Sequence, residues 1–163
     1  MTDSDGHHHH NTLPPGKMRP EIWSKQKALA RSILARPFAE LVEKTTQPFI
    51  SSVSHTIAPQ ASFFDGNLLL VGDALTLFRP HVALSANQAA VDCLLLEKSL
   101  GGEITGKEWE RRVLQYGART MLLSVMTGNY TQFGGVRFVV SAVGYGMLLV
   151  RQRAEDLWWG VFG

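Results

Sequence analysis

Apolar residues recur every three or four positions between Pro20 and Glu43, and this spacing predicts amphipathic helix. Pro37 interrupts the pattern, because a proline inside a helix removes a backbone hydrogen bond and clashes with the preceding turn. We therefore expect two short helices. Pro37 is expected in the first turn of the second helix, where its missing N–H has no acceptor to lose. The preceding residues 2–18 are polar and rich in His, Pro and Gly, and they predict a loop.

Short stretches with extended character come next. Ser51–His55 and Phe63–Phe64 contain enough β-branched or aromatic residues to predict brief extended segments. Leu68–Val71 is an apolar run that follows the turn dipeptide Asp65-Gly66 and stops at Gly72. Such a run is typical of a strand buried on both faces, as found inside a parallel or mixed sheet.

The second half of the chain predicts longer helices. One begins at Ser85 or Asn87 and is closed by Gly101-Gly102, since glycine is common just after a helix. Thr105 heads the next, with Glu108 three residues later in a capping-box arrangement that satisfies two unpaired backbone donors. The apolar positions that follow continue at helical spacing, so we expect this helix to be long.

The last segment, residues 138–150, is apolar and is bounded by Arg137 and Arg151. A helix needs about 20 apolar residues to span the hydrocarbon core of a bilayer. The segment therefore favours a packed or interfacial helix over a membrane span. Trp158 and Trp159 near the end of the chain suit either a lipid surface or the edge of a core. Peripheral membrane contact through residues 138–159 is thus left open.

Together these elements predict an α+β fold, mostly helical with a few short strands. We divide it into residues 1–66, residues 67–133 and the apolar helix and tail of residues 134–163. With 163 residues, 45% of them apolar and 18% charged, the chain favours a globular core over disorder. The 16 basic and 14 acidic residues are scattered without a run of like charge, which argues against nucleic acid as a partner.

Cysteine and histidine usage adds two expectations. Cys93 is the only cysteine, so no intrachain disulfide forms, and a reducing compartment such as the cytoplasm is favoured. Its apolar surroundings predict a buried, inert thiol. His7–His10 are four adjacent histidines, but we find no Cys, Asp or Glu at ligand spacing beside them. We therefore predict an ordinary loop there and no metal site.

The chemically informative stretch follows the apolar run. Gly72-Asp73 places a carboxylate at the end of the predicted strand, the edge at which α/β folds tend to bind ligands. One carboxylate accepts hydrogen bonds from two hydroxyls of a ribityl or ribose diol. The helix that begins near Ser85 offers unpaired N–H groups and a positive dipole end, which stabilise negative charge. A Gly-Asp pair alone is weak evidence, since aspartate often only caps a turn.

The longer string is more specific. Leu68–Ala74, Arg79–Val82 and Asn87–Asp92 closely resemble the second FAD-binding motif of the class A, aromatic-hydroxylase type of FAD-dependent monooxygenases. The resemblance extends over roughly residues 2–133. In particular the chain looks like the fungal members similar to 2,6-dihydroxypyridine 3-monooxygenase.

This resemblance implies a cofactor and a set of contacts. The cofactor-binding residues that it implies are Gly72, Asp73, Pro80, Ser85, Ala86 and Asn87. Asp73 would bind ribityl or ribose hydroxyls, Pro80 would lie beside the isoalloxazine ring, and the amides at the helix start would face the pyrimidine side of the flavin. The implied cofactor is FAD, with NAD(P)H as reductant, O₂ as oxidant and a small aromatic or heteroaromatic ring as substrate. No side chain is assigned a catalytic role, and His81 is left between proton transfer and a structural hydrogen bond.

Two departures from the family pattern change what is expected. The family usually has glycines just before the last helix of the motif, whereas this chain has Ala83-Leu84-Ser85. The G-x-G-x-x-G turn that holds the ADP pyrophosphate is not among these residues. The resemblance therefore implies a carboxyl-terminal fragment that lacks the Rossmann nucleotide-binding unit and is inactive by itself, as a truncated or split gene would produce.

Two alternatives to a flavoprotein fragment stay open. A non-catalytic interaction or membrane-peripheral protein would use residues 138–159 as its working surface. A plain α+β domain would use Asp73 only to cap a turn.

Overall fold

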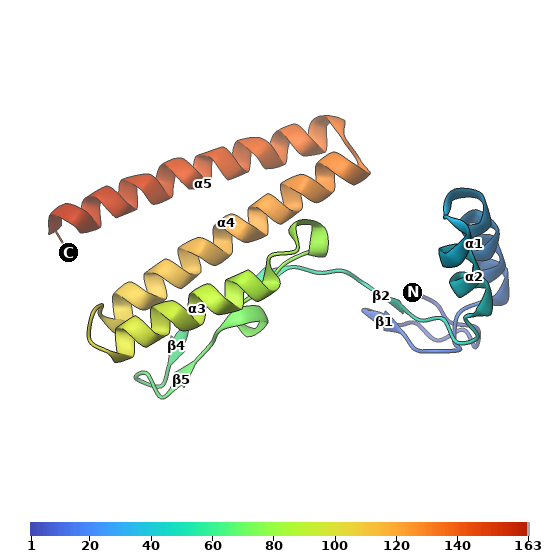
Figure 1. The fold of residues 1–163 in the computed structure, drawn as a ribbon, viewed down its shortest axis with the longest axis horizontal. Coiled ribbons are helices and arrows are strands. Elements are labelled where there is room, and N and C mark those ends of the chain that lie inside the picture. Colours follow the sequence, from blue (N-terminus) through green and yellow to red (C-terminus); the bar gives the residue numbers. More distant parts are fainter. Residues whose placement is uncertain (163) are drawn as a thin grey trace. The chain divides into compact units, whose positions relative to one another are not determined.

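The computed structural model describes the backbone of residues 1–162 and the side chains of residues 1–159. The chain forms two compact units, Met1–Val53 and the residues from Ser54 onward. The first unit contains β1 (Thr12–Leu13), α1 (Pro20–Ile33), α2 (Arg36–Lys44) and β2 (Ile50–Ser51). The second contains β3 (Thr56–Ile57), β4 (Ser62–Phe63), β5 (Leu68–Leu69), η1 (Gly72–Ala74), β6 (Thr76–Leu77), η2 (Pro80–Val82), α3 (Ser85–Leu100), α4 (Gly106–Gln132) and α5 (Gly135–Phe162) (Figure 1). The predicted class, α+β and mostly helical, is confirmed, while the three-part division of the chain stays a prediction.

The first unit contains the two short helices that the sequence predicts. Pro37 lies in the first turn of α2, where a missing N–H has no helical acceptor to lose. Arg31 near the end of α1 donates to the Glu43 carboxylate of α2 at 2.7 Å, which links the two helices. β1 and β2 pair antiparallel, and Leu13 on β1 is buried.

The helices of the second unit lie side by side, with α4 between α3 and α5 (Figure 1). α3 begins at Ser85 and is followed by Gly101, as predicted. Thr105 caps α4, because its side-chain oxygen accepts the Glu108 N–H at 3.1 Å. The Glu108 carboxylate binds two arginine side chains one turn later. Of the two hydrogen bonds of the predicted capping box, the one from the Glu108 N–H to the Thr105 side chain is therefore formed. The Glu108 carboxylate, which would make the second, binds the two arginines instead.

The core of the second unit lies where α4 meets the short strands. Ala61, Leu75, Trp109 and Val113 are buried together there. Glu110, next to Trp109, accepts two consecutive backbone N–H groups at the start of β4, at 2.7 and 3.0 Å. These bonds hold the β4–β5 pair against α4 and satisfy donors that the pair leaves unpaired.

α4 presents small residues, two glycines and a serine, to the segment that contains β6 and η2. A β-carbon at Gly117 would overlap the Thr76 hydroxyl, and one at Gly128 would lie 2.5 Å from the ring of His81. Ser124, between these glycines, donates its hydroxyl to a backbone carbonyl of the segment at 2.6 Å. β6 and η2 are therefore seated directly on α4.

The strand predicted at Leu68–Val71 is wrong in kind. β5 covers only Leu68–Leu69, pairs antiparallel with β4, and leaves Leu68 46% exposed. Leu70 and Val71 instead pack against the buried core after the strand has ended. The run is apolar because one side of it covers that core. In the described part of the chain, the sheet that contains β5 has two strands.

The predicted burial of Cys93 is also wrong. α3 buries Gln88 and Asp92, which are one turn apart on one face of the helix. Cys93 follows Asp92 by one residue, and successive residues of a helix point about 100° apart. The thiol is therefore exposed.

α5 packs on α4 as the second arm of an antiparallel helical hairpin. Gln152 is buried and donates to the Gln115 carbonyl at 3.0 Å, and Arg111 donates to Asp156 at 2.6 Å. The outer face of α5 exposes the apolar side chains of Val136, Val139, Val140, Val143, Met147, Val150 and Leu157. No helix among residues 1–162 combines the length and the apolar character that a membrane crossing requires.

Candidate functional site

Gly72 begins η1 in a backbone conformation that favours glycine. Its φ is +59°, in the left-handed region, and its N–H donates to the Asp92 carboxylate at 2.8 Å. A β-carbon at this position would lie 3.2 Å from the Ala89 β-carbon on α3. A side chain at position 72 would therefore push η1 away from α3. The contact of Gly72 with a flavin, implied by the family resemblance, stays a prediction.

Asp92 is the residue that fixes this turn, and sequence reasoning gave it no role. Its side chain is fully buried, and Gln88 donates to its second carboxylate oxygen at 2.7 Å. Burial raises the pKa of Asp92, and the hydrogen bonds from Gly72 and Gln88 oppose that rise. The spacing of Gln88 and Asp92, four residues apart on a predicted helix, was the available signal.

Asp73 lies beside this buried network but faces solvent. Among the described residues, no hydrogen bond or ion pair engages its carboxylate. The turn that carries it packs on α3 through Gly72. Asp73 is therefore an available acceptor on a fixed backbone, and it does not serve as the cap of its own turn.

Whereas Asp73 is a hydrogen-bond acceptor, the start of α3 supplies hydrogen-bond donors. Leu84 occupies the N-cap position without a side-chain hydrogen bond, and Ser85, Ala86 and Asn87 are exposed. The first N–H groups of a helix have no partner inside the helix, and they carry its positive dipole end. Ala83 adopts φ 51° and ψ 35°, a left-handed conformation that glycine occupies without steric cost. The backbone thus makes a sharp turn at Ala83, just before α3 begins.

η2 brings Pro80 and His81 into the same segment. Pro80 is exposed, whereas the His81 ring lies against Gly128 of α4. This packing fixes the position of the ring, and the choice between a structural hydrogen bond and proton transfer for His81 stays a prediction. Nearby, Arg79 donates to the His55 ring at 3.3 Å. Burial and the charge of Arg79 lower the pKa of His55.

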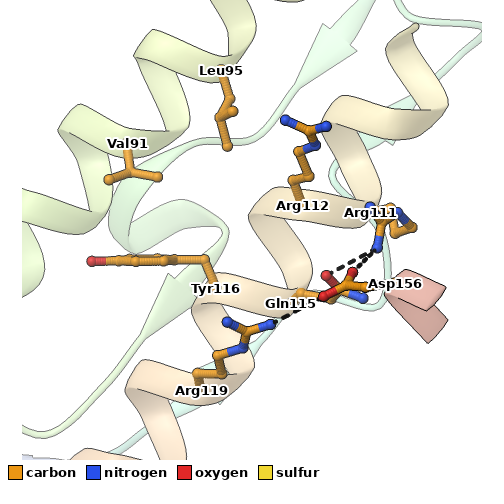
Figure 2. A pocket seen from close by; sticks show the side chains of 8 residues that line it. All are labelled: Val91, Leu95, Arg111, Arg112, Gln115, Tyr116, Arg119 and Asp156. Carbon is orange, nitrogen blue, oxygen red and sulfur yellow. Dashed lines mark hydrogen bonds and ion pairs between the residues drawn. The ribbon is translucent and has the colours of Figure 1, made fainter. Parts of the chain in front are cut away.

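A hollow of about 450 Å³ is lined by residues of α3, α4 and α5, and none of the six implied cofactor-binding residues lines it (Figure 2). It is lined by Val91, Leu95, Arg111, Arg112, Gln115, Tyr116, Arg119 and Asp156. Arg111 donates to Glu108 at 2.8 Å and to Asp156 at 2.6 Å. The hydrogen bond from Arg111, aided by one from Arg112, holds the pKa of Glu108 at about 2 against the opposing effect of burial. Each of the three arginines is paired with a carboxylate of the protein: Arg111 and Arg112 with Glu108, and Arg119 with Asp156.

The residues present fit the flavin end of FAD. Asp73 offers an unpaired acceptor for hydroxyls, and the start of α3 offers donors for the carbonyl-bearing edge of a flavin ring. The pyrophosphate end of FAD requires a glycine-rich turn before a helix. The 163 residues contain no G-x-G-x-x-G sequence, so this chain does not itself provide that turn.

Comparisons with known proteins found proteins that are similar to this chain. A family described as FAD binding domain-like matches residues 1–55. The 2,6-dihydroxypyridine 3-monooxygenase of Paenarthrobacter nicotinovorans is 31% identical over 133 residues, which are 78% of this chain and 31% of that enzyme. The structure of 2,6-dihydroxypyridine-3-hydroxylase from Arthrobacter nicotinovorans superimposes with a TM-score of 0.64 at 26% identity, over 83% of this chain and 35% of that one.

These matches cover most of this chain, but the chain spans only about a third of the length of the relatives. The relatives are bacterial by name, so the likeness to fungal members stays a prediction. The predicted similarity itself is confirmed. Over most of its length, the chain is similar to enzymes of the FAD-dependent aromatic-ring monooxygenase class.

Proposed function

We propose that this chain supplies the flavin-contacting part of an FAD-dependent monooxygenase that hydroxylates an aromatic or heteroaromatic ring with NAD(P)H and O₂. The observation that carries the proposal is the unpaired, exposed carboxylate of Asp73 on a turn that Asp92 holds against α3. The names of the matched enzymes, which act on 2,6-dihydroxypyridine, support a heteroaromatic substrate class.

Each motif residue has a role in this proposal. Asp73 accepts hydrogen bonds from ribityl hydroxyls, and Gly72 lets the backbone approach without a side chain in the way. Pro80 lies along the ring, and the amides of Ser85–Asn87 donate to the pyrimidine edge. FAD, when bound, supplies the redox chemistry with O₂. The protein contributes binding, orientation and charge stabilisation.

The start of α3 has an electrostatic part in this reaction class. A reduced flavin carries negative charge at its pyrimidine side, and a helix amino end presents N–H groups and a positive partial charge. Donors that are already in place stabilise this charge without reorganising. The absence of a side-chain cap on α3 leaves these amides available to the ring.

A titration of the ¹⁵N-labelled chain with FMN, which carries the ring and the ribityl chain, tests the proposal. We expect the backbone amide signals of Gly72, Asp73 and Ser85–Asn87 to shift. ADP, which lacks the flavin ring, is the control ligand and is expected to leave these signals in place. FMN shifts that are absent, or that cluster around the arginine-lined hollow instead, would contradict the proposal.

The variant Asp73→Asn, titrated in the same way, measures how much the Asp73 carboxylate contributes to FMN affinity. A charge-assisted hydrogen bond contributes about 1.5 to 3 kcal/mol, so we expect FMN to bind about 10- to 100-fold more weakly. Asp65→Asn is the matched control, because Asp65 is also an exposed turn residue but lies outside the motif. Equal affinities for the two variants would remove Asp73 from the site.

A second candidate function rests on the outer face of α5. Its large apolar side chains are exposed along several turns, and contiguous exposed apolar surface of this kind marks interaction sites. If this surface binds lipid peripherally, the purified chain should sediment with anionic vesicles and Met147→Glu should abolish sedimentation. Leu100→Glu, an equally exposed apolar position on α3, is the control. A chain that stays in the supernatant contradicts this second function and leaves the first untouched.

A further inference from the structure

The first residues of the chain fold into a small hairpin. The backbone N–H of His9 donates to the Met1 carbonyl at 2.7 Å, and Thr2 pairs with His8 in an antiparallel bridge. The Asp3 N–H donates to the His7 carbonyl at 3.0 Å. In an extended segment successive side chains point to opposite sides. The histidine run is therefore divided into two pairs of alternate residues.

The two pairs have different neighbours. His9 Nε2 lies 2.8 Å and His7 Nδ1 lies 3.8 Å from the same carboxylate oxygen of Asp3. The rings of His8 and His10 instead contact each other, with centroids 5.1 Å apart. His7 and His9 thus converge on a carboxylate, and the other pair does not.

Asp3 is fixed at the centre of this arrangement. It is only 4% exposed, and its other oxygen accepts the N–H groups of Asp5 and His7 at 2.9 and 2.8 Å. His9 Nε2 lies 2.8 Å from the remaining oxygen, so both carboxylate oxygens are held in place. The carboxylate is therefore oriented before any ligand arrives.

Asp5 adds a second carboxylate. One ligand atom each from Asp3, Asp5 and His7 can be chosen so that all lie within 4.8 Å of one another. Ligands of one zinc-type ion bind it at about 2.0 to 2.2 Å, so they lie about 4 Å apart or less, and small side-chain rotations suffice to reach this. Lys17 Nζ lies 2.5 Å from the Asp5 carboxylate, so a metal ion bound there would compete with this ammonium group.

We infer that Asp3, Asp5, His7 and His9 form a binding site for a divalent transition metal of the zinc type. Two imidazole nitrogens and two carboxylate oxygens suit Zn²⁺ or Co²⁺ in four-fold coordination. The ion would replace the hydrogen bond between His9 and Asp3 and would displace the Lys17 ammonium from Asp5. The sequence pattern alone does not indicate this site, because the hairpin that pairs Thr2 with His8 is what brings Asp3 to His7 and His9.

The competing explanation is that four adjacent histidines bind metal without a defined site. Titration of the purified chain, made without an affinity tag, with Co²⁺ separates the two, because coordinated Co²⁺ absorbs visible light. We expect His7→Ala/His9→Ala to weaken binding ~100-fold and His8→Ala/His10→Ala to leave it within about threefold. Equal losses in the two variants, a larger loss in the second, or no binding by the unaltered chain would overturn the site.

Asp5 and Lys17 give a test that histidine binding alone cannot pass. Both side chains are about half exposed, at 47% and 48%, so changing them leaves the hairpin intact. Asp5→Asn is expected to weaken Co²⁺ binding ~10-fold, and Lys17→Met to strengthen it a few-fold by removing the competing cation. Circular dichroism confirms that each variant is folded. Affinities that respond to neither change would overturn the role of the carboxylates.

Discussion

Replacing Trp109 with alanine is expected to lower the free energy of unfolding by about 3 to 5 kcal/mol, the cost of emptying a large aromatic site in a core. Trp109 is 1% exposed and packs with Leu75, Val113 and Ala61, which join α4 to the short strands. Urea unfolding of the purified chain, followed by circular dichroism, measures the loss. Since the same tryptophan donates to the Asp92 carbonyl at 3.3 Å, its removal also loosens the turn at Gly72.

Trp158→Ala is the matched control for this change. Trp158 has the same side chain on α5 but is 56% exposed, so we expect a loss below about 1 kcal/mol. A loss of similar size in both variants would mean that the buried cluster around Trp109 does not dominate the stability of this unit.

Asp92→Ala is expected to cost about 2 to 4 kcal/mol. The substitution leaves the buried N–H of Gly72 and the amide of Gln88 without acceptors, and each unsatisfied buried donor costs about 1 to 3 kcal/mol. Asp73 follows Gly72 directly, so the variant should also weaken FMN binding without touching the flavin. Unfolding in urea and the FMN titration measure the two effects on the same protein.

Asp92→Asn is the conservative control, with an expected cost of about 1 kcal/mol. In the described residues the Gln88 carbonyl oxygen has no hydrogen-bond partner, so a flipped Gln88 amide can accept from the new side chain. A cost as large as that of the alanine variant would show that this rearrangement does not occur.

Comparison of the unaltered chain with Asp92→Asn gives a pH dependence of the free energy of unfolding whose sign is defined. Because burial raises the pKa of Asp92 in the folded state, its contribution to stability is fully present below the ordinary value of 3.8 and is lost as pH rises through the folded pKa. The asparagine variant lacks this titration. The stability difference between the unaltered chain and Asp92→Asn should therefore be largest near the acid end and shrink toward neutral pH.

Helices were predictable from the sequence because their signals are local. The apolar spacing, Pro37, Thr105 and the glycines after α3 each act within one or two turns, and the structure places helix boundaries where these residues indicate. The strand at Leu68–Val71 was not predictable in kind. An apolar run reports burial, and it does not distinguish a strand inside a sheet from one edge of a two-stranded pair.

The candidate site also has a part that the sequence indicates and a part that it does not. The resemblance selected Gly72, Asp73 and the start of α3 as a unit, and the structure shows that the turn and the helix are in contact. The hydrogen bond from the Gly72 N–H to the Asp92 carboxylate makes that contact. Asp92 lies twenty residues along the chain from Gly72, and no local sequence pattern indicates a hydrogen bond over that separation. Cys93 was misjudged for a related reason, since an apolar run on a helix includes residues on its solvent face.

The glycines on α4 have a consequence for how this segment can vary. Gly117 faces Thr76, and Gly128 faces the ring of His81, each without room for one more carbon. A larger residue on the helix requires the side chain opposite to shift or to be smaller, so these positions are sterically linked as pairs. The two pairs, with the Ser124 hydrogen bond between them, hold the segment around Pro80 close to α4, and a substitution at one member of a pair favours a compensating change at the other.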